Sequence, residues 1–255
     1  MIVQTVPIRH PLTLAAEPLT PSSFAPFGAV LANPAPATLP SVTLSASSLP
    51  PSVGAVVANQ GTAIQYRALA PPLRDLYAQA ASARPSTPRT TMFVCGAREL
   101  LPSESGSAGL FEVKVLERHP FTTQTFVPLG ASAASSRYLV IVAPSLAPDA
   151  SSAVEKQLPV PEGDDSLPGR GMPDLSRLRA FVATGAQAVT YGAGTWHAPM
   201  AALGPAGTAI DFVVVQFAND VPVEDCQEVV LEGGKEGDAP RIVVRVPGPP
   251  KMSKL

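Results

Sequence analysis

The stretch FEVKVLERHPFTTQTFVPLG, residues 111–130, carries the pattern that decides the fold. Alternate residues of a strand face the same way, so one face of its first half presents three apolar side chains followed by Glu117 and His119. Pro120 lacks a backbone N–H and ends this strand, and a second extended run follows over 122–127. The pattern predicts a strand that leaves a packed core and brings an acid and an imidazole to the mouth of a pocket.

The composition is that of a chain able to bury a sizeable core. Of its 255 residues, 45% are hydrophobic and 15% are charged, with a net charge of -2. This balance argues against a nucleic-acid partner and against a polybasic membrane surface. No apolar run reaches the about 18 residues of a membrane-spanning helix. The two cysteines, Cys95 and Cys226, do not make a disulfide framework, which favours a reducing, intracellular setting.

Strand-like segments recur along the whole chain between turn signals. They lie at 91–95, 111–119, 122–127, 137–143, 186–191, 208–217, 226–231 and 241–246. Strand–helix alternation is missing, so a parallel doubly wound sheet is not expected. The pattern predicts a mainly β fold, an antiparallel barrel or jelly roll with a few short helices and long Pro-rich loops.

Proline-rich segments interrupt this pattern without dividing the chain. We expect one domain over residues 1–255, with insertions near 33–53 and 144–173 and a C-terminal tail near 247–255. A short amphipathic helix is predicted over 72–83, where apolar residues recur at helical spacing.

Two of the three histidines, His119 and His197, occur in separate strand blocks just before turns. A lone histidine is more often a hydrogen-bonded structural residue, but two in corresponding places support a shared site about as well as a structural role. The blocks have the spacing of the two cupin motifs, in which Glu117, His119, Gln124 and His197 would converge inside one barrel. Such a site could hold a divalent ion or none, because the usual His-x-His is Glu-x-His here and the usual Glu is Gln124.

Three segments resemble the ureidoglycolate lyase family, formerly called ureidoglycolate hydrolases. They are LERHPFTTQTFVPLG, LRAFVATGAQAVTYGAGTWHAPM and DFVVVQF, in this order, and EPLTPSSFAPFGAVL and the NQGTA turn resemble the family as well. The resemblance covers most of residues 12–232 outside the insertions. It implies a cupin-like double-stranded β-helix barrel and a homodimer. Relatives often have Trp-His-His-Pro, whereas the second histidine is Ala198 here.

The resemblance implies a lyase that cleaves a carbon–nitrogen bond of ureidoglycolate, giving glyoxylate and urea late in allantoin and purine breakdown. The substrate hydroxyl must lose a proton and the departing urea nitrogen must gain one. We expect Glu117, His119 and His197 to share these roles, with the order left open. A divalent ion, nickel by the resemblance, would be held by Glu117, His119, Gln124 and His197, and no organic cofactor is expected.

The substrate is a small anion, so a cation is expected to bind its carboxylate. Arg67, Lys114 and Arg118 are candidates, but Lys114 and Arg118 alternate with Glu117 and are expected on a solvated face, which favours Arg67. Further candidate contacts are Asn59, Gln124, Tyr191 and Trp196. Each also has a structural explanation: a turn for Asn59, backbone hydrogen bonding for Gln124, and the wall or core, which is the more common role, for Tyr191 and Trp196.

Two other functions remain open at this stage: a different, metal-dependent cupin enzyme, and a non-catalytic cupin that binds a small ligand. The final tripeptide, Ser253-Lys254-Leu255, has the form of the address read by the peroxisomal import receptor. A peroxisomal location is therefore predicted, with the cytoplasm as the alternative.

Overall fold

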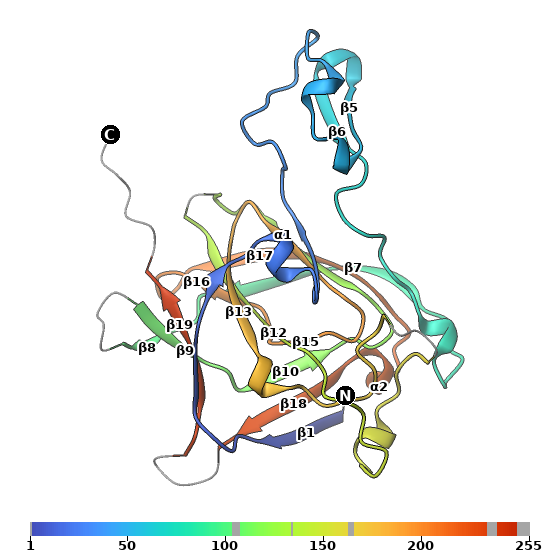
Figure 1. The fold of residues 1–255 in the computed structure, drawn as a ribbon, viewed down its shortest axis with the longest axis vertical. Coiled ribbons are helices and arrows are strands. Elements are labelled where there is room, and N and C mark those ends of the chain that lie inside the picture. The colour runs from blue at the N-terminus through green and yellow to red at the C-terminus, as the bar shows by residue number, and fades with distance from the viewer. Residues whose placement is uncertain (1, 104–107, 134, 163–165, 234–238, 249–255) are drawn as a thin grey trace.

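The computed structural model describes residues 2–103, 108–133, 135–162, 166–233 and 239–248. The fold is mainly β, as predicted, and Figure 1 shows most of the strands packed together in one body. Its α-helices are single turns, α1 (Pro21–Phe24) and α2 (Pro222–Asp225). None of the helices that the structure describes has the length and apolar character needed to cross a bilayer.

The strands form three sheets and a separate hairpin. The eight-stranded sheet has the order β1 (Ile2–Pro7), β18 (Gln227–Glu232), β10 (Val115–Arg118), β15 (Trp196–His197), β12 (Arg137–Ala143), β13 (Arg179–Thr184) and β3 (Glu17–Pro18), with β16 (Ala201–Leu203) beside β12. The five-stranded sheet has the order β4 (Gly28–Leu31), β14 (Ala188–Tyr191), β11 (Gln124–Leu129), β17 (Ala209–Ala218) and β7 (Thr87–Gly96).

The third sheet has four strands, in the order β2 (Leu12–Ala15), β19 (Ile242–Pro247), β9 (Ala108–Glu112) and β8 (Leu101–Pro102). The hairpin pairs β5 (Ala55–Ala58) with β6 (Ala63–Tyr66). Short 3-10 turns are η1 (Ala46–Ser48), η2 (Pro51–Val53), η3 (Asn59–Gly61), η4 (Tyr77–Gln79), η5 (Glu155–Gln157) and η6 (Leu175–Arg177). Over the described ranges these sheets stack on one another, and none closes into a continuous ring of strands.

The eight-stranded sheet is the middle layer, and β12 shows why its sequence is apolar throughout. Tyr138, Val140 and Val142 point to the core shared with the five-stranded sheet. The alternate residues, Leu139, Ile141 and Ala143, point to the core shared with the four-stranded sheet. A strand that is buried on both faces needs apolar residues at every position, whereas a half-buried strand alternates.

The segment 111–119 is two strands rather than the single strand that its alternation predicted. β9 pairs with β19 in the four-stranded sheet, whereas β10 pairs with β18 and β15 in the eight-stranded sheet. The chain changes sheets at Val113 and Lys114, and this shifts the alternation by one residue. As a result Leu116, not Val115, continues the buried face begun by Phe111 and Val113.

The prediction of a helix over 72–83 is wrong. Asp75 instead forms a β-bridge with Thr122, and the Leu76 N–H donates to the Phe121 carbonyl at 2.8 Å. Pairing with the chain at 121–123 satisfies backbone groups of this segment in place of helical hydrogen bonds. Only the turn η4 remains helical, and it buries Tyr77.

The predicted insertions occupy different places. Residues 33–53 lead through η1 and η2 into the β5–β6 hairpin, which stands apart from the body at one end of the molecule in Figure 1. Residues 144–173 instead return to the body, where the Leu146 N–H donates to the carbonyl of Met172. The segment 163–165 and the tail 249–255 lie outside the described residues.

Candidate functional site

The candidate site lies between the eight-stranded and five-stranded sheets, at one end of β10 and β15. Glu117 on β10 is directly opposite His197 on β15. His197 is also opposite Val142, whose side chain belongs to the core between these two sheets, so both site residues face that layer. His119 follows one residue after β10, where Pro120 ends the strand.

Each histidine is held by a backbone carbonyl on its Nδ1 side. His119 Nδ1 lies 2.6 Å from the Asp225 carbonyl oxygen, and His197 Nδ1 lies 2.9 Å from that of Thr195. A carbonyl only accepts, so both Nδ1 atoms donate, and in the neutral form of each ring Nε2 carries the lone pair. Both Nε2 atoms are buried and have no hydrogen-bond partner among the residues that the structure describes. Such orphaned atoms are costly unless a ligand uses them.

Glu117 completes a triad with the two histidines. Ligand atoms of the three side chains lie within 4.8 Å of one another, and the imidazole centroids are 5.6 Å apart. Burial and the neighbouring His119 lower the pKa of His197 to about 3, so this imidazole is neutral. The 3.7 Å separation between His197 Nε2 and Glu117 Oε1 is therefore neither an ion pair nor a hydrogen bond.

The carboxyl of Glu117 is buried beside His119 and Cys226. Burial raises its pKa above the ordinary value, and the opposing effect of His119 does not cancel this shift. Cys226 lies behind it, with Sγ 3.8 Å from Glu117 Oε2. Burial also raises the pKa of Cys226 to about 12, so the thiol keeps its proton and donates to the carboxylate.

The five-stranded sheet contributes Gln124 and Tyr191, which are cross-strand neighbours on β11 and β14. The ring of Tyr191 stacks on His197 with centroids 3.9 Å apart and planes 11° from parallel. Gln124 Nε2 donates to Gln216 Oε1 at 2.7 Å, so Gln124 Oε1 is left buried and unpartnered, as is the Tyr191 hydroxyl. These two atoms add one acceptor and one donor to the wall of the site.

Arg118 and Trp196 support the triad from the opposite face of the sheet. Arg118 is fully buried, contrary to the expected solvated face, and its guanidinium lies 4.4 Å from the Trp196 ring. The one-residue shift after Val113 turns Arg118 inward. Its nitrogens donate to Gln227 Oε1 and to the carbonyls of the 169–171 segment, which also accepts from Trp196 Nε1.

The other predicted contacts lie elsewhere in the structure. Lys114 is exposed and pairs with Glu112 at 3.4 Å. Asn59 begins the turn of the β5–β6 hairpin, and Arg67 follows β6, where its Nε donates to Gln65 Oε1 at 3.2 Å. The structure therefore brings Glu117, His119, Gln124, Tyr191 and His197 together, with Trp196 behind them, and does not bring Asn59, Lys114 or Arg67 to this place.

The donor set fits a divalent metal ion. Two imidazole lone pairs and a carboxylate are ligands that first-row divalent ions accept, and Gln124 Oε1 offers a further oxygen. The neutral state of His197 is also the one that binds metal. The triad is thus a candidate metal centre, as well as a set of acid–base groups.

Three residues that touch this site were not assigned a role from the sequence: Gln216, Asp225 and Cys226. Gln216 interrupts the apolar run 212–218 near the end of β17, and this polar residue is the signal that could have identified it. Asp225 acts on His119 through its main-chain oxygen, for which no side-chain pattern exists.

Comparison with known proteins gives consistent matches over most of the chain. The family model described as ureidoglycolate lyase matches residues 11–236. A protein of Schizosaccharomyces pombe named ureidoglycolate lyase is 34% identical over 212 residues, covering 83% of this chain and 88% of that protein. One of Saccharomyces cerevisiae with the same name is 33% identical over 225 residues, covering 85% and 93%. One of Burkholderia mallei is 32% identical over 208 residues, covering 82% and 84%.

Proposed function

Because this chain belongs to the ureidoglycolate lyase family, we propose that its Glu117–His119–His197 site breaks the carbon–nitrogen bond of ureidoglycolate and releases glyoxylate and urea. Family membership makes the protein a lyase that acts on ureidoglycolate. The observation that carries the proposed chemistry is the convergence of two unpartnered Nε2 atoms on one buried carboxyl group.

The reaction needs two proton movements, which balance. A base takes the proton of the substrate hydroxyl, the carbon–oxygen bond becomes the aldehyde of glyoxylate, and the electrons of the breaking C–N bond pass to nitrogen. An acid then gives that nitrogen one proton, so that urea leaves neutral. Glu117, with its raised pKa, suits the proton-holding role, and the imidazole Nε2 atoms accept hydrogen bonds from the hydroxyl.

The wall residues match the remaining polar groups of the substrate. Gln124 Oε1 is a buried acceptor, which suits the N–H groups of the ureido moiety. Burial raises the pKa of Tyr191 far above its ordinary value, so the phenol remains a neutral donor for a substrate oxygen. Each contact would satisfy an atom that has no partner in the protein.

A bound divalent ion is the alternative to this acid–base arrangement, because side chains that coordinate an ion cannot at the same time hold or accept the protons of the substrate. Glu117, His119, His197 and Gln124 would hold a divalent ion, nickel by the family resemblance, which when bound polarises the hydroxyl and carboxylate oxygens of the substrate. The protein residues would keep the same orientations, because the backbone carbonyls of Asp225 and Thr195 fix both imidazoles. Metal analysis of the purified protein identifies the ion.

A product assay tests the proposed reaction. Purified protein is incubated with racemic ureidoglycolate, with and without chelator, and urea, glyoxylate and ammonia are measured. We expect equal amounts of urea and glyoxylate and no ammonia. Ammonia without urea would show hydrolysis of the ureido group instead, and retention of ureidoglycolate without turnover would show a non-catalytic binding protein.

We also propose that the protein is a homodimer that associates through β7. This strand is at the edge of the five-stranded sheet, and its residues 90–96 carry no charge. Its exposed Met92 is aligned across Val213 with exposed Val127, and its exposed Val94 is aligned across Asp211 with exposed Leu129. An uncharged edge strand with an apolar face favours pairing with a second copy.

We further propose that the protein is imported into peroxisomes and acts there in allantoin breakdown. The support is the terminal Ser253-Lys254-Leu255, which lies outside the described residues. A fluorescent protein fused to the N-terminus should reach peroxisomes, and removal of these three residues should leave it in the cytoplasm. Cytoplasmic fluorescence of the intact fusion would contradict the proposed location.

A further inference from the structure

Within the described part of the chain, one hydrogen bond orients His119. Its Nδ1 donates to the Asp225 carbonyl oxygen at 2.6 Å, and its Nε2 has no partner in the same described residues. Loss of this bond would free the ring to rotate and to place its proton on Nε2 instead. An Nε2 that carries a proton cannot accept one from the substrate or bind a metal. The position of the Asp225 carbonyl oxygen therefore decides whether His119 can do either.

Asp225 is held from its side-chain end by a buried tyrosine. The Tyr77 hydroxyl donates to Asp225 Oδ1 at 2.7 Å, and the Asn219 N–H donates to the same oxygen at 2.9 Å. Tyr77 is 2% exposed, and its ring packs on Phe121 with centroids 5.6 Å apart. Burial and the bond to Asp225 raise the pKa of Tyr77, so the phenol keeps the proton that it donates.

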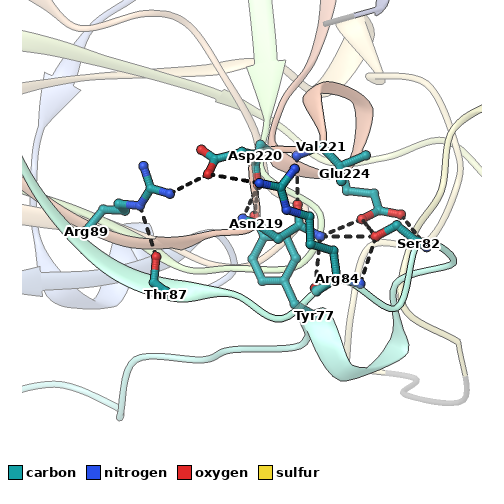
Figure 2. A network of polar contacts seen from close by, with 10 residues as sticks. Tyr77, Ser82, Arg84, Thr87, Arg89, Asn219, Asp220, Val221 and Glu224 are labelled. Atoms are coloured by element: carbon teal, nitrogen blue, oxygen red, sulfur yellow. Dashed lines mark hydrogen bonds and ion pairs between the residues drawn. The ribbon is translucent and has the colours of Figure 1, made fainter.

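A second set of bonds fixes the turn that carries Asp225. Figure 2 shows Tyr77 beside Asn219 and Glu224, with Ser82 completing the network. Asn219 Nδ2 donates to Glu224 Oε2 at 2.6 Å, and the Ser82 N–H and hydroxyl donate to the two oxygens of the same carboxylate at 2.9 and 2.6 Å. The segment around 77–82 is thus bonded to α2, the turn that ends at Asp225.

The same turn reaches a second member of the triad. Cys226 follows Asp225 directly, and its Sγ is 3.8 Å from Glu117 Oε2. Two consecutive residues therefore contact His119 and Glu117 from the side opposite to substrate, one through a carbonyl and one through a thiol.

We propose, on the basis of the function proposed above, that Tyr77 and Asp225 are positioning residues that hold His119 with its proton on Nδ1 and its Nε2 lone pair toward the substrate. Neither side chain touches the substrate position. Both act through the Asp225 carbonyl, in the way that outer-shell partners fix the tautomer of a histidine ligand. The segment 72–83 thereby acquires a function beyond packing.

The tautomer of His119 can be observed directly, without substrate. Nitrogen-15 NMR of the metal-free protein distinguishes a protonated Nδ1 from a protonated Nε2. We expect wild-type His119 to carry its proton on Nδ1, and Tyr77→Phe to show a mixture of both forms. In steady-state assays Tyr77→Phe should lower kcat about tenfold with little change in KM, which is the size of effect expected for an outer-shell partner.

Two further variants separate positioning from general destabilisation. Asp225→Asn retains a side-chain acceptor for Tyr77 and should keep the wild-type tautomer, whereas Asp225→Ala should behave like Tyr77→Phe. Tyr138→Phe is the matched control, because Tyr138 is equally buried and donates to a backbone carbonyl, that of Gln187, at 2.6 Å. It should lower thermal stability by a similar amount and leave kcat and the His119 signal unchanged.

An unaltered His119 tautomer in both Tyr77→Phe and Asp225→Ala would overturn the proposed positioning role. So would a loss of kcat that Tyr138→Phe reproduces. If ureidoglycolate is not cleaved at all, the proposed reaction fails, but the NMR comparison still decides whether Tyr77 and Asp225 set the state of His119.

Discussion

At the scale of single residues, the site is marked by buried polar atoms that lack hydrogen-bond partners. Four polar atoms are buried without a hydrogen-bond partner in the described ranges of the chain: the two Nε2 atoms, Gln124 Oε1 and the Tyr191 hydroxyl. Folding a chain with four such atoms in one region costs free energy that a bound substrate or ion can recover. The unpartnered atoms are therefore stronger support for a ligand site than the presence of histidines alone.

Glu117→Gln tests the role of the carboxyl group. The amide keeps the size of the side chain and its place opposite His197, but it can no longer hold and release a proton. We expect kcat to fall about 100-fold with a smaller change in KM. Glu112→Gln is the matched control, since Glu112 is partly exposed and pairs with Lys114 away from the site. Equal losses in both variants would remove Glu117 from the chemistry.

Arg118→Met tests the support behind the triad. The variant leaves the carbonyls of 169–171 and the amide of Gln227 without their buried donor. An unsatisfied buried group is costly, so the free energy of unfolding in urea should fall by about 3 kcal/mol.

Arg179→Met serves as the control for this change. Arg179 also lies over an aromatic ring, that of Phe181, but it is partly exposed and pairs with Glu17 at the surface. Its loss should cost under about 1 kcal/mol. A similar loss in the two variants would mean that the buried bonds of Arg118 are not what stabilises the 169–171 segment.

At the scale of secondary-structure elements, α2 joins the site to the 77–82 segment, and the link includes a carboxylate. Burial acts to raise the pKa of Glu224, but hydrogen bonds from Ser82 and Asn219 outweigh it and hold the pKa below its ordinary value. A depressed folded-state pKa stabilises the fold above the unfolded-state pKa, and this stabilisation is lost as the pH falls through the folded-state value.

Glu224→Gln should therefore destabilise the protein most near neutral pH. The difference in free energy of unfolding between wild type and Glu224→Gln should be largest at about pH 7 and should shrink at about pH 3. Urea unfolding at the two pH values measures it. A difference that stays constant, or grows in acid, would show that ionised Glu224 does not stabilise α2.

The sequence predicted part of this arrangement, and the failures have physical causes. Alternation identified Glu117 and His119, and the spacing of the second block identified His197. Alternation could not show that the chain passes from one sheet to another at 113–114, because both halves of 111–119 have strand character. That change placed Arg118 in the core instead of in solvent.

The prediction of a helix over 72–83 was wrong for a different reason. Its helical periodicity is real, but its backbone donors are satisfied by the chain at 121–123, which is distant in sequence. The contact of Asp225 with His119 could not be predicted from the sequence either, because a main-chain carbonyl is present at every residue and gives no pattern.

At the scale of the whole molecule, three stacked layers give the site its shape. The eight-stranded sheet supplies the triad, the five-stranded sheet supplies Gln124 and Tyr191, and the four-stranded sheet closes the core behind Trp196. The mainly β class and the buried strand over 137–143 were predictable from the sequence. The stacking of three sheets was not, because strand order depends on long-range pairing.

Met92→Asp tests the proposed dimer. Met92 is exposed on β7, so an aspartate should be tolerated in the monomer but should place like charges together where two copies pair. Sedimentation velocity should show a dimer for wild type and a monomer for the variant. Leu39→Asp, at a position even more exposed than Met92 but on the approach to the β5–β6 hairpin, should remain dimeric. Wild-type protein that sediments as a monomer would contradict the proposed association.

The most direct test of the central claim is the rate of glyoxylate release from ureidoglycolate by wild type, His119→Ala and His197→Ala, each confirmed as folded by circular dichroism. Both substitutions remove an Nε2 atom that the structure leaves unpartnered. We expect each to lower kcat at least about 100-fold while urea and glyoxylate remain equal in amount. Wild-type rates in either variant would contradict a site built on the convergence of Glu117, His119 and His197.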